Sequence, residues 1–271
     1  MEKLIIVRGG GDLASGTIYT LRKCGFPVLV LETERPTAIR RSVAFSEAVY
    51  DGASRVEDMD CTLAKSPDEA LELIGAGKLA LLVDPGCGVL GKLRPWALVD
   101  AVIAKKNLGT HRGMAQKTIA LGPGFTAGED VDLVIETMRG HDLGRIIYEG
   151  KAMENTGTPG LIAGHASDRV IHAAQGGVLE AAAEIGELVE KGQTIAVIRG
   201  CGSEFPVEAS ISGVLRGIIR DGLTVPKGMK IADIDPRAQK KQNCFTISDK
   251  ARCLAGSVLA GLMYLEERDG K

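Results

Sequence analysis

The first 34 residues alternate between strand-like and helix-like patterns of apolar side chains. Lys3–Val7 is an apolar run of strand length, and a second such run, Val28–Leu31, ends at Glu32. Between them, Leu13–Cys24 carries apolar residues at helical spacing, and Gly25 ends that segment. The order predicts a strand–loop–helix–strand unit, which begins a Rossmann-like parallel sheet.

Further apolar runs extend this pattern. Leu79–Val83 and Lys117–Leu121 each stop at a glycine-rich loop, and Val131–Thr137 predicts one more strand. Ser66, with proline at the next position, predicts the start of a helix over 69–76. The fold class predicted for this part is therefore α/β with a Rossmann-like parallel sheet. Its glycine-rich loops are expected to meet at the carboxyl edge of the sheet, where ligands gather in such folds.

A repeat without gaps dominates the second half of the chain. Residues 177–198 and 213–234 align at an offset of 36 residues and share glycine, valine, leucine and isoleucine positions. Each copy predicts short strands separated by glycine turns, and the pair resembles the biotinyl/lipoyl-type barrel-sandwich hybrid. Its carrier proteins hold a modified lysine between the halves, but the connection Arg199–Phe205 contains no lysine. The module is therefore interpreted as a structural or docking element, and Cys201 as a free surface thiol.

The chain ends in a predicted amphipathic helix. Ser248 caps it, and Asp249–Glu267 carries one broad apolar stripe that is expected to dock back on the first domain. We predict three parts: a Rossmann-like nucleotide- or phosphate-binding domain over 1–165, the repeated β module over 166–236, and the C-terminal helix over 237–271.

Composition narrows the possible environment and partners. The 271 residues carry a net charge of −2, and acidic and basic residues are interspersed. The sequence therefore has no basic tract of the kind that binds nucleic acid. No apolar run approaches the ~18–20 residues of a membrane span, and no signal peptide is expected. The six cysteines are scattered without a C-x-x-C pair, which is typical of free thiols in a reducing cytosol. We predict a cytoplasmic protein with no nucleic-acid or membrane partner, and homo-oligomerisation stays open.

The first loop supplies the candidate chemistry. Gly9, Gly11 and Ala14 match the G-x-G-x-x-G/A spacing, and Glu32 follows at the next strand end. Without a Cβ the backbone approaches a phosphate, and the helix start directs N–H groups and its dipole at the anion. The alternative is a tight turn that uses glycine for packing alone. The predicted ligand-binding residues are Gly9, Gly10, Gly11, Asp12, Glu32, Arg40, Arg41, Lys105, Lys106, Asn107, Gly122 and Gly124.

Basic residues near the predicted sheet edge could add to that site. Arg40 and Arg41 follow the second strand, where a ribose or a further phosphate would lie. Lys105 and Lys106, beside Asn107, could neutralise a phosphate as point charges. Solvated basic loops are the alternative. No metal-ligand spacing is recognisable, so no metal is predicted, and no catalytic residue is assigned.

Several stretches together resemble the accessory-protein family of selenium-dependent molybdenum hydroxylases. They are Val7–Ala14, Ile39–Arg41 with Phe45–Val49, Ala104–Thr110, Leu121–Gly128 and Asn155–Gly160. The resemblance implies a role in maturation of the hydroxylase, which would be the partner protein. Hydroxylases of this kind commonly use a dinucleotide form of the molybdopterin cofactor. Together with the glycine spacing, the resemblance therefore predicts a small nucleotide-bearing ligand at the first glycine loop. The candidate cofactors are molybdopterin dinucleotide and NAD(P).

Two other functions stay open at this point, as does the question of whether the chain is an enzyme. One is an NAD(P)-dependent oxidoreductase, although the chain has no Tyr-x-x-x-Lys pair and no proton donor beyond His111 or His141. The other is a non-catalytic scaffold, in which the repeat module and the terminal helix bind the hydroxylase.

Overall fold

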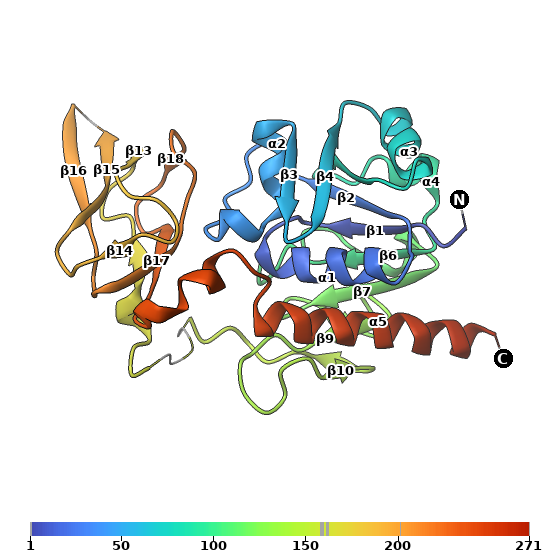
Figure 1. Cartoon of the computed structure of the whole chain (residues 1–271). Coiled ribbons are helices and arrows are strands. Elements are labelled where there is room, and N and C mark those ends of the chain that lie inside the picture. The colour runs from blue at the N-terminus through green and yellow to red at the C-terminus, as the bar shows by residue number, and fades with distance from the viewer. Residues whose placement is uncertain (1, 158–159, 161–162, 201, 271) are drawn as a thin grey trace. The chain divides into compact units, whose positions relative to one another are not determined.

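The chain folds into two compact units. The computed structural model describes residues 2–157, 160, 163–200 and 202–270. Unit 1 comprises Met1–Pro36, Ala44–Thr156 and Ile247–Lys271, and unit 2 comprises Thr37–Val43 and Gly157–Thr246 (Figure 1). The terminal segment Ile247–Lys271 thus belongs to the same unit as the first strand.

Unit 1 is built on a nine-stranded mixed sheet with the order β10-β9-β7-β6-β1-β2-β5-β4-β3. Neighbouring strands from β9 to β4 are parallel, and β10 and β3 pair antiparallel at the two edges. The central strands are apolar and buried except at their carboxyl ends, where β1 ends in Arg8 and β2 in Glu32, as strands covered on both faces require. The strands are β1 (Ile5–Arg8), β2 (Val28–Glu32), β3 (Ala53–Val56), β4 (Met59–Ala64), β5 (Leu79–Val83), β6 (Ala97–Asp100), β7 (Lys117–Leu121), β9 (Leu133–Ile135) and β10 (Ile146–Ile147), beside a small sheet of β8 (Thr126–Ala127) and β11 (Gly150–Lys151).

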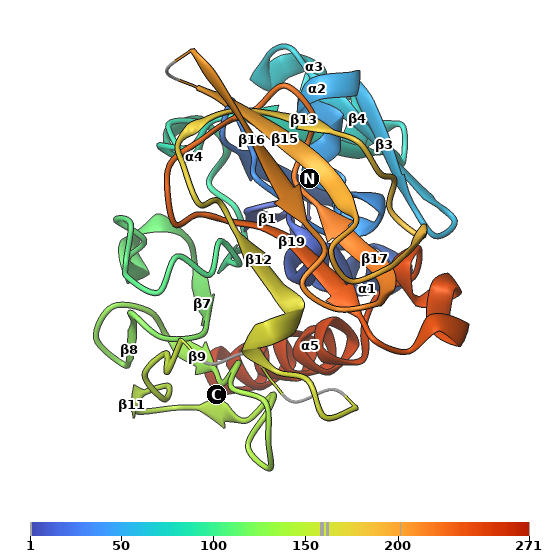
Figure 2. The ribbon, with the colours of Figure 1, turned by 90° about the vertical axis from the view of Figure 1, so that its left-hand side faces the viewer.

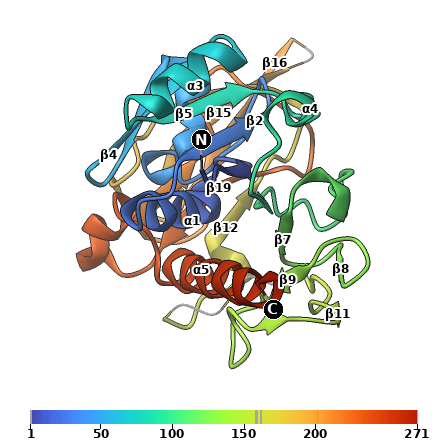
Figure 3. The same ribbon diagram turned by 90° about the vertical axis from the view of Figure 1, so that its right-hand side faces the viewer.

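Helices cover both faces of this sheet (Figure 3). On one face α1 and α5 lie side by side, and Gly16 allows the close approach because a Cβ there would lie 2.7 Å from the carbonyl oxygen of Ala251. On the other face Ile74 of α3 packs with Ile6 and Leu29 of the sheet. The helices are α1 (Asp12–Lys23), α2 (Ala48–Asp51), α3 (Pro67–Gly75), α4 (Leu90–Leu93) and α5 (Asp249–Asp269), with 3-10 turns at Arg41–Val43, Phe45–Glu47, Arg112–Met114, Ser167–Arg169 and Ala238–Cys244.

The predicted Rossmann-like architecture is wrong for this sheet. A doubly wound fold places a helix after each strand, whereas the stretches 101–116 and 122–132, which follow β6 and β7, carry no α-helix. The sheet is also extended by antiparallel edge strands, of which β3 joins β4 through a turn at Glu57 and Asp58. Unit 1 is therefore α/β with a mixed sheet.

Unit 2 consists of two four-stranded sheets, β12-β19-β17-β14 and β16-β15-β13-β18, in which all pairs are antiparallel (Figure 2). The 36-residue offset recurs in the starts of β13 and β17, β14 and β18, and β15 and β19. Each sheet takes strands from both copies of the repeat. The strands are β12 (Val170–His172), β13 (Gly177–Ala181), β14 (Leu188–Val189), β15 (Thr194–Gly200), β16 (Ser203–Glu208), β17 (Gly213–Ile218), β18 (Thr224–Val225) and β19 (Lys230–Asp235).

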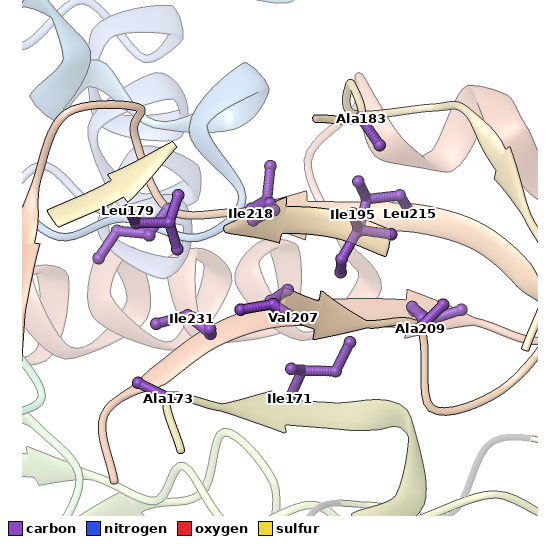
Figure 4. Packing of buried hydrophobic residues seen from close by; sticks show 14 of the residues in the cluster. Ile171, Ala173, Leu179, Ala183, Ile195, Val207, Ala209, Leu215, Ile218 and Ile231 are labelled. Carbon is purple, nitrogen blue, oxygen red and sulfur yellow. The ribbon is translucent and has the colours of Figure 1, made fainter. Parts of the chain in front are cut away.

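Equivalent residues of the two copies fill the core of unit 2 (Figure 4). Leu179 and Ile195 of the first copy correspond to Leu215 and Ile231 of the second, and all four are fully buried. The predicted barrel-like module is wrong, because the strands make two separate sheets and no ladder joins them among the described residues. Cys201, predicted to be a surface thiol, lies outside the described residues.

The C-terminal turns of α5 are tied to the amino ends of the sheet strands. The carboxylate of Glu266 lies 2.9 Å from the Nζ atoms of both Lys3 and Lys117, and Trp96 Nε1 donates to it at 3.2 Å. The hydrogen bonds from Lys3 and Lys117 lower the pKa of Glu266 to about 2. Lys117 is itself buried and also pairs with Asp269 at 3.1 Å.

This cluster predicts an acid-dependent stability. A carboxyl whose pKa is depressed in the folded state contributes stability above its ordinary value of 4.5, and that contribution is lost as the pH falls toward 2. We expect the thermal midpoint of the wild type to fall more steeply between these pH values than that of Glu266→Gln. Glu72→Gln, an exposed position on α3, is the control and should follow the wild type. Parallel curves for wild type and Glu266→Gln would contradict the assignment.

Candidate functional site

The first two glycines of the loop after β1 donate hydrogen bonds to the protein's own groups. The N–H of Gly9 donates to the carbonyl of Leu31 at 2.7 Å, and the N–H of Gly10 donates to the Glu32 carboxylate at 2.7 Å. Burial raises the pKa of Glu32, while the N–H groups of Thr33 and Gly10 lower it in part. The Glu32 carboxylate thus accepts the N–H of Gly10, one of the groups that was predicted to bind a phosphate.

The neighbouring backbone explains why this loop needs glycine. Gly9 has a φ of +97°, and a Cβ on it would lie 3.1 Å from Val102 Cα. A Cβ on Gly10 would lie 3.0 Å from the backbone nitrogen of Ser46, while Gly11 faces open space. The binding of a nucleotide-bearing ligand at this loop stays a prediction. Close packing accounts for the first two glycines.

Arg40 and Arg41 are engaged within unit 2. Arg40 Nη2 donates to the carbonyls of Asn243 and Thr246 at 2.9 and 3.1 Å. Arg41 Nε donates to the carbonyl of Ile218 at 2.9 Å. These bonds hold the 37–43 segment to the module. The two guanidinium groups thus stabilise backbone turns.

The loops after β6 and β7 pack directly on each other. Lys105 and Lys106 are exposed, and the side chain of Asn107 closes its own turn by three hydrogen bonds to residues 109 and 110. Gly124, with a φ of +108°, lies against Lys106, because a Cβ there would be 2.5 Å from Lys106 Cα. A Cβ on Gly122 would lie 2.7 Å from Thr137 Oγ1. Gly124 and the backbone of Lys106 thus lie together through close packing. That the glycine-rich loops line one ligand site stays a prediction.

Arg8 joins three of the loops at the carboxyl edge. Its guanidinium is buried and lies 3.3 Å from Asp100 Oδ2, and it donates to Thr110 Oγ1 at 2.9 Å. It also donates to the carbonyls of Pro85 at 2.9 Å and Leu108 at 3.1 Å. Since all these groups are satisfied within the protein, Arg8 organises the edge and presents no free charge there.

A group of charged residues, the Lys250 cluster, gathers where α1 and α5 begin. It consists of Lys250, Arg139, Asp12, Glu136 and Asp249, and Arg139 is bonded to Asp249 at 2.9 and 3.0 Å. Burial lowers the pKa of Lys250 most, and the nearby Arg139 guanidinium lowers it further. The three carboxylates act in the opposite direction. An ammonium with a lowered pKa at the carboxyl edge of a sheet marks a candidate functional site.

Glu136 of this cluster also lines a cavity of about 460 Å³, the Glu136 cavity. Glu136 is 3% exposed and follows β9 directly. Its carboxylate oxygens accept the N–H groups of Met138 and Met153, both at 2.7 Å. The other charged lining residues are Asp142, Arg145, Glu149 and Lys151, and the apolar ones are Ile146, Ile147, Tyr148 and Met153. The whole lining comes from the single stretch 136–153.

Sequence patterns did not single out this site. Of the predicted ligand-binding residues, only Asp12 belongs to the Lys250 cluster. In the sequence, Glu136 has the pattern of a polar residue that ends a strand. Lys250 has the pattern of an ordinary lysine in the first turn of an amphipathic helix. Among the described residues, no three His, Cys, Asp or Glu side chains gather as a metal-ligand set.

Comparison with known proteins identifies one bacterial relative of unassigned function. No model of a known protein family matches the chain. The uncharacterized protein YqeB of Escherichia coli (strain K12) is 53% identical over 156 residues. That match covers 58% of this chain but only 29% of YqeB, so the chain spans less than a third of its relative.

The similar solved structures have low scores. An aspartoacylase family protein from Mesorhizobium loti matches 87% of this chain and 85% of its own, with 13% identity and a TM-score of 0.28. The ectoine utilization protein EutE (DoeB) from Ruegeria pomeroyi matches 86% and 57%, with 11% identity and a TM-score of 0.25. A succinylglutamate desuccinylase/aspartoacylase from Rhodobacter sphaeroides matches 25% and 22%, with 21% identity and a TM-score of 0.24. With scores this low, no activity is carried over to this chain.

These comparisons contradict the family suggested by the sequence motifs. No model of a known protein family matches the chain, and the name of the relative, uncharacterized protein YqeB, states no function. The predicted role in molybdenum hydroxylase maturation is therefore withdrawn, together with its selenium and molybdenum cofactor, the oxidoreductase alternative and the hydroxylase scaffold. The motifs were misleading because their glycines, such as Gly9 and Gly124, serve close packing.

In the part of the chain that the structure describes, none of the helices combines the length and the apolar character that a membrane crossing demands.

Proposed function

We propose that the chain binds a small organic molecule in the Glu136 cavity. The observation that carries this proposal is a buried carboxylate that forms part of a cavity wall and lies close to a lysine of lowered pKa. Ligand sites of proteins are cavities of ~300–1,000 Å³ with mostly apolar walls and a few fixed polar groups. The Glu136 cavity has this size, and its lining combines four apolar residues with five charged ones, of which Glu136 is buried.

The position of the cavity in the sheet supports the same function. Glu136 follows the carboxyl end of β9, which is parallel to β7, and ligands of open α/β sheets bind outside the carboxyl ends of such strands. The loop from Glu136 to Arg145 is held rigidly against α5. Arg139 bonds to Asp249, and a Cβ on Gly144 would lie 2.7 Å from the sulfur of Cys253. The wall of the cavity is therefore preorganised.

Filling the cavity should abolish ligand binding. Ile147 lies on the edge strand β10 and lines the cavity, so Ile147→Trp places a large ring there on a strand that tolerates aromatic residues. We expect a ligand-observed NMR screen of small metabolites to find compounds that bind the wild type and fail to bind this variant. The control is Leu188→Trp at a position that is 61% exposed on β14 of unit 2, and it should keep every hit. A screen in which no hit is lost in Ile147→Trp would overturn the proposal.

We further propose the cytosol as the compartment. The described cysteines Cys24, Cys61, Cys87, Cys244 and Cys253 are all free thiols, and free thiols persist in a reducing compartment.

A further inference from the structure

We propose that the ligand of the Glu136 cavity is an organic ammonium ion with an apolar body, whose charged nitrogen faces the Glu136 carboxylate. This inference rests on the proposed function and names the class of molecule that the same site takes. The charge balance of the lining, the hydrogen-bonding capacity of Glu136 and the apolar residues of the wall support this class of ligand.

The lining carries an excess of negative charge. Arg145 Nη1 lies 3.1 Å from Asp142 Oδ1, so these two residues neutralise each other. The remaining charged residues are Glu136, Glu149 and Lys151, of which Glu149 and Lys151 are exposed. Glu136 is therefore the buried charge on the wall, where the low dielectric strengthens its attraction for a cation. The Lys250 cluster, to which Glu136 also belongs, sets the cations Lys250 and Arg139 against three carboxylates, so negative charge remains in excess by one there as well.

Glu136 has acceptor capacity left for a ligand. A carboxylate offers about four lone-pair positions, and the N–H groups of Met138 and Met153 use one on each oxygen. These two bonds fix the orientation of the carboxylate. An ammonium group brings up to three donors, so the remaining positions match a charge-assisted hydrogen bond.

The rest of the wall suits an apolar body next to that charge. Ile146 and Ile147 are partly buried, and the ring of Tyr148 stands edge-to-face against the ring of Tyr264 with 4.7 Å between centroids. That contact fixes the Tyr148 ring, which remains 51% exposed. An aromatic ring attracts an organic cation through its face, in addition to the contact it makes with apolar groups.

A matched set of probes tests the charge requirement by isothermal titration calorimetry. Phenethylamine carries the ammonium, phenethyl alcohol is its neutral counterpart, and phenylacetate carries the opposite charge on the same ring. We expect phenethylamine to bind at least about tenfold more tightly than either of the others, since a hydrogen bond to a charged group discriminates to about that extent.

Two substitutions locate the effect. Glu136→Gln keeps the shape of the side chain and removes its charge, so the preference for phenethylamine over phenethyl alcohol should disappear. Glu149→Gln makes the same change at an exposed lining position and should keep the preference. Should Glu136→Gln fail to fold in a thermal melt, Tyr148→Leu serves in its place. It should weaken phenethylamine binding severalfold more than phenethyl alcohol binding.

Equal affinity for the amine and the alcohol, tighter binding of phenylacetate, or a preference that survives Glu136→Gln would each overturn the inference. These results leave the proposed function intact as long as Ile147→Trp abolishes the binding of other compounds. If none of the probes binds while the metabolite screen yields hits of other classes, the inference fails alone. If the screen yields no hit that Ile147→Trp removes, the proposed function fails and the inference fails with it.

Discussion

Replacing Arg8 with methionine is expected to lower the free energy of unfolding by about 3–5 kcal/mol, the usual cost of removing one partner of a buried ion pair. The side chains of Arg8 and Asp100 are only 10% and 3% exposed. Without the guanidinium, the Asp100 carboxylate keeps only Thr110 Oγ1 at 2.6 Å and the N–H of Val102 at 3.2 Å. The carbonyls of Pro85 and Leu108 also lose their donor.

Urea unfolding followed by the fluorescence of Trp96, the single tryptophan of the chain, measures this loss in unit 1. The matched control is Arg55→Met, which breaks the ion pair between Arg55 and Asp60. These two side chains are 62% and 69% exposed, so the substitution should lower the free energy of unfolding by only about 0–1 kcal/mol. Adding Asp100→Asn to Arg8→Met removes the uncompensated charge and should restore part of the stability. A cost for Arg8→Met no larger than that for Arg55→Met would show that Arg8 does not organise the carboxyl edge.

The sequence predicts those elements that are marked by an unbroken run of apolar residues or by a capping residue next to the helix. The apolar runs at β1, β2, β5 and β7 are strands, and Ser66 caps α3 by accepting the N–H of Glu69 at 3.1 Å. The hairpin of β3 and β4 escaped prediction because its turn residues, Glu57 and Asp58, include neither glycine nor asparagine. Glu57 nonetheless adopts a φ of +54°. A strained turn of this kind is stabilised by its surroundings, here by the bond from Arg252 to the Glu57 carboxylate at 2.6 Å.

The candidate site could not be predicted, for two different physical reasons. The glycine spacing at residues 9–11 is the same whether a phosphate or the protein's own backbone lies against it, and only the fold brings Ser46 and Val102 there. Glu136 and Lys250 lie far apart in the sequence and acquire their properties through burial and proximity. Spacing rules detect local geometry, whereas a perturbed charge depends on tertiary neighbours.

The repeat glycines are expected to be among the least replaceable residues of the chain. Gly177 and Gly213 are equivalent in the two copies, and a Cβ on either would collide with a carbonyl oxygen of the paired strand, that of Arg199 or Asp235 respectively. Because these oxygens belong to rigid, paired backbone, the strands would have to separate. We expect Gly213→Ala to destabilise unit 2 by about 3 kcal/mol, at the upper end of the usual cost of overpacking.

Chemical denaturation followed by far-UV circular dichroism measures this effect, and the repeat supplies an internal test. Gly177→Ala should cost about as much as Gly213→Ala, because the same contact recurs in the other sheet. Gly256→Ala is the control. Gly256 lies within α5 with open space around it, so alanine should raise stability by about 0.5–1 kcal/mol through its helix propensity. If Gly213→Ala leaves the free energy of unfolding unchanged, or if Gly177→Ala and Gly213→Ala lower it by very different amounts, close approach of paired strands is not the reason that the repeat retains glycine.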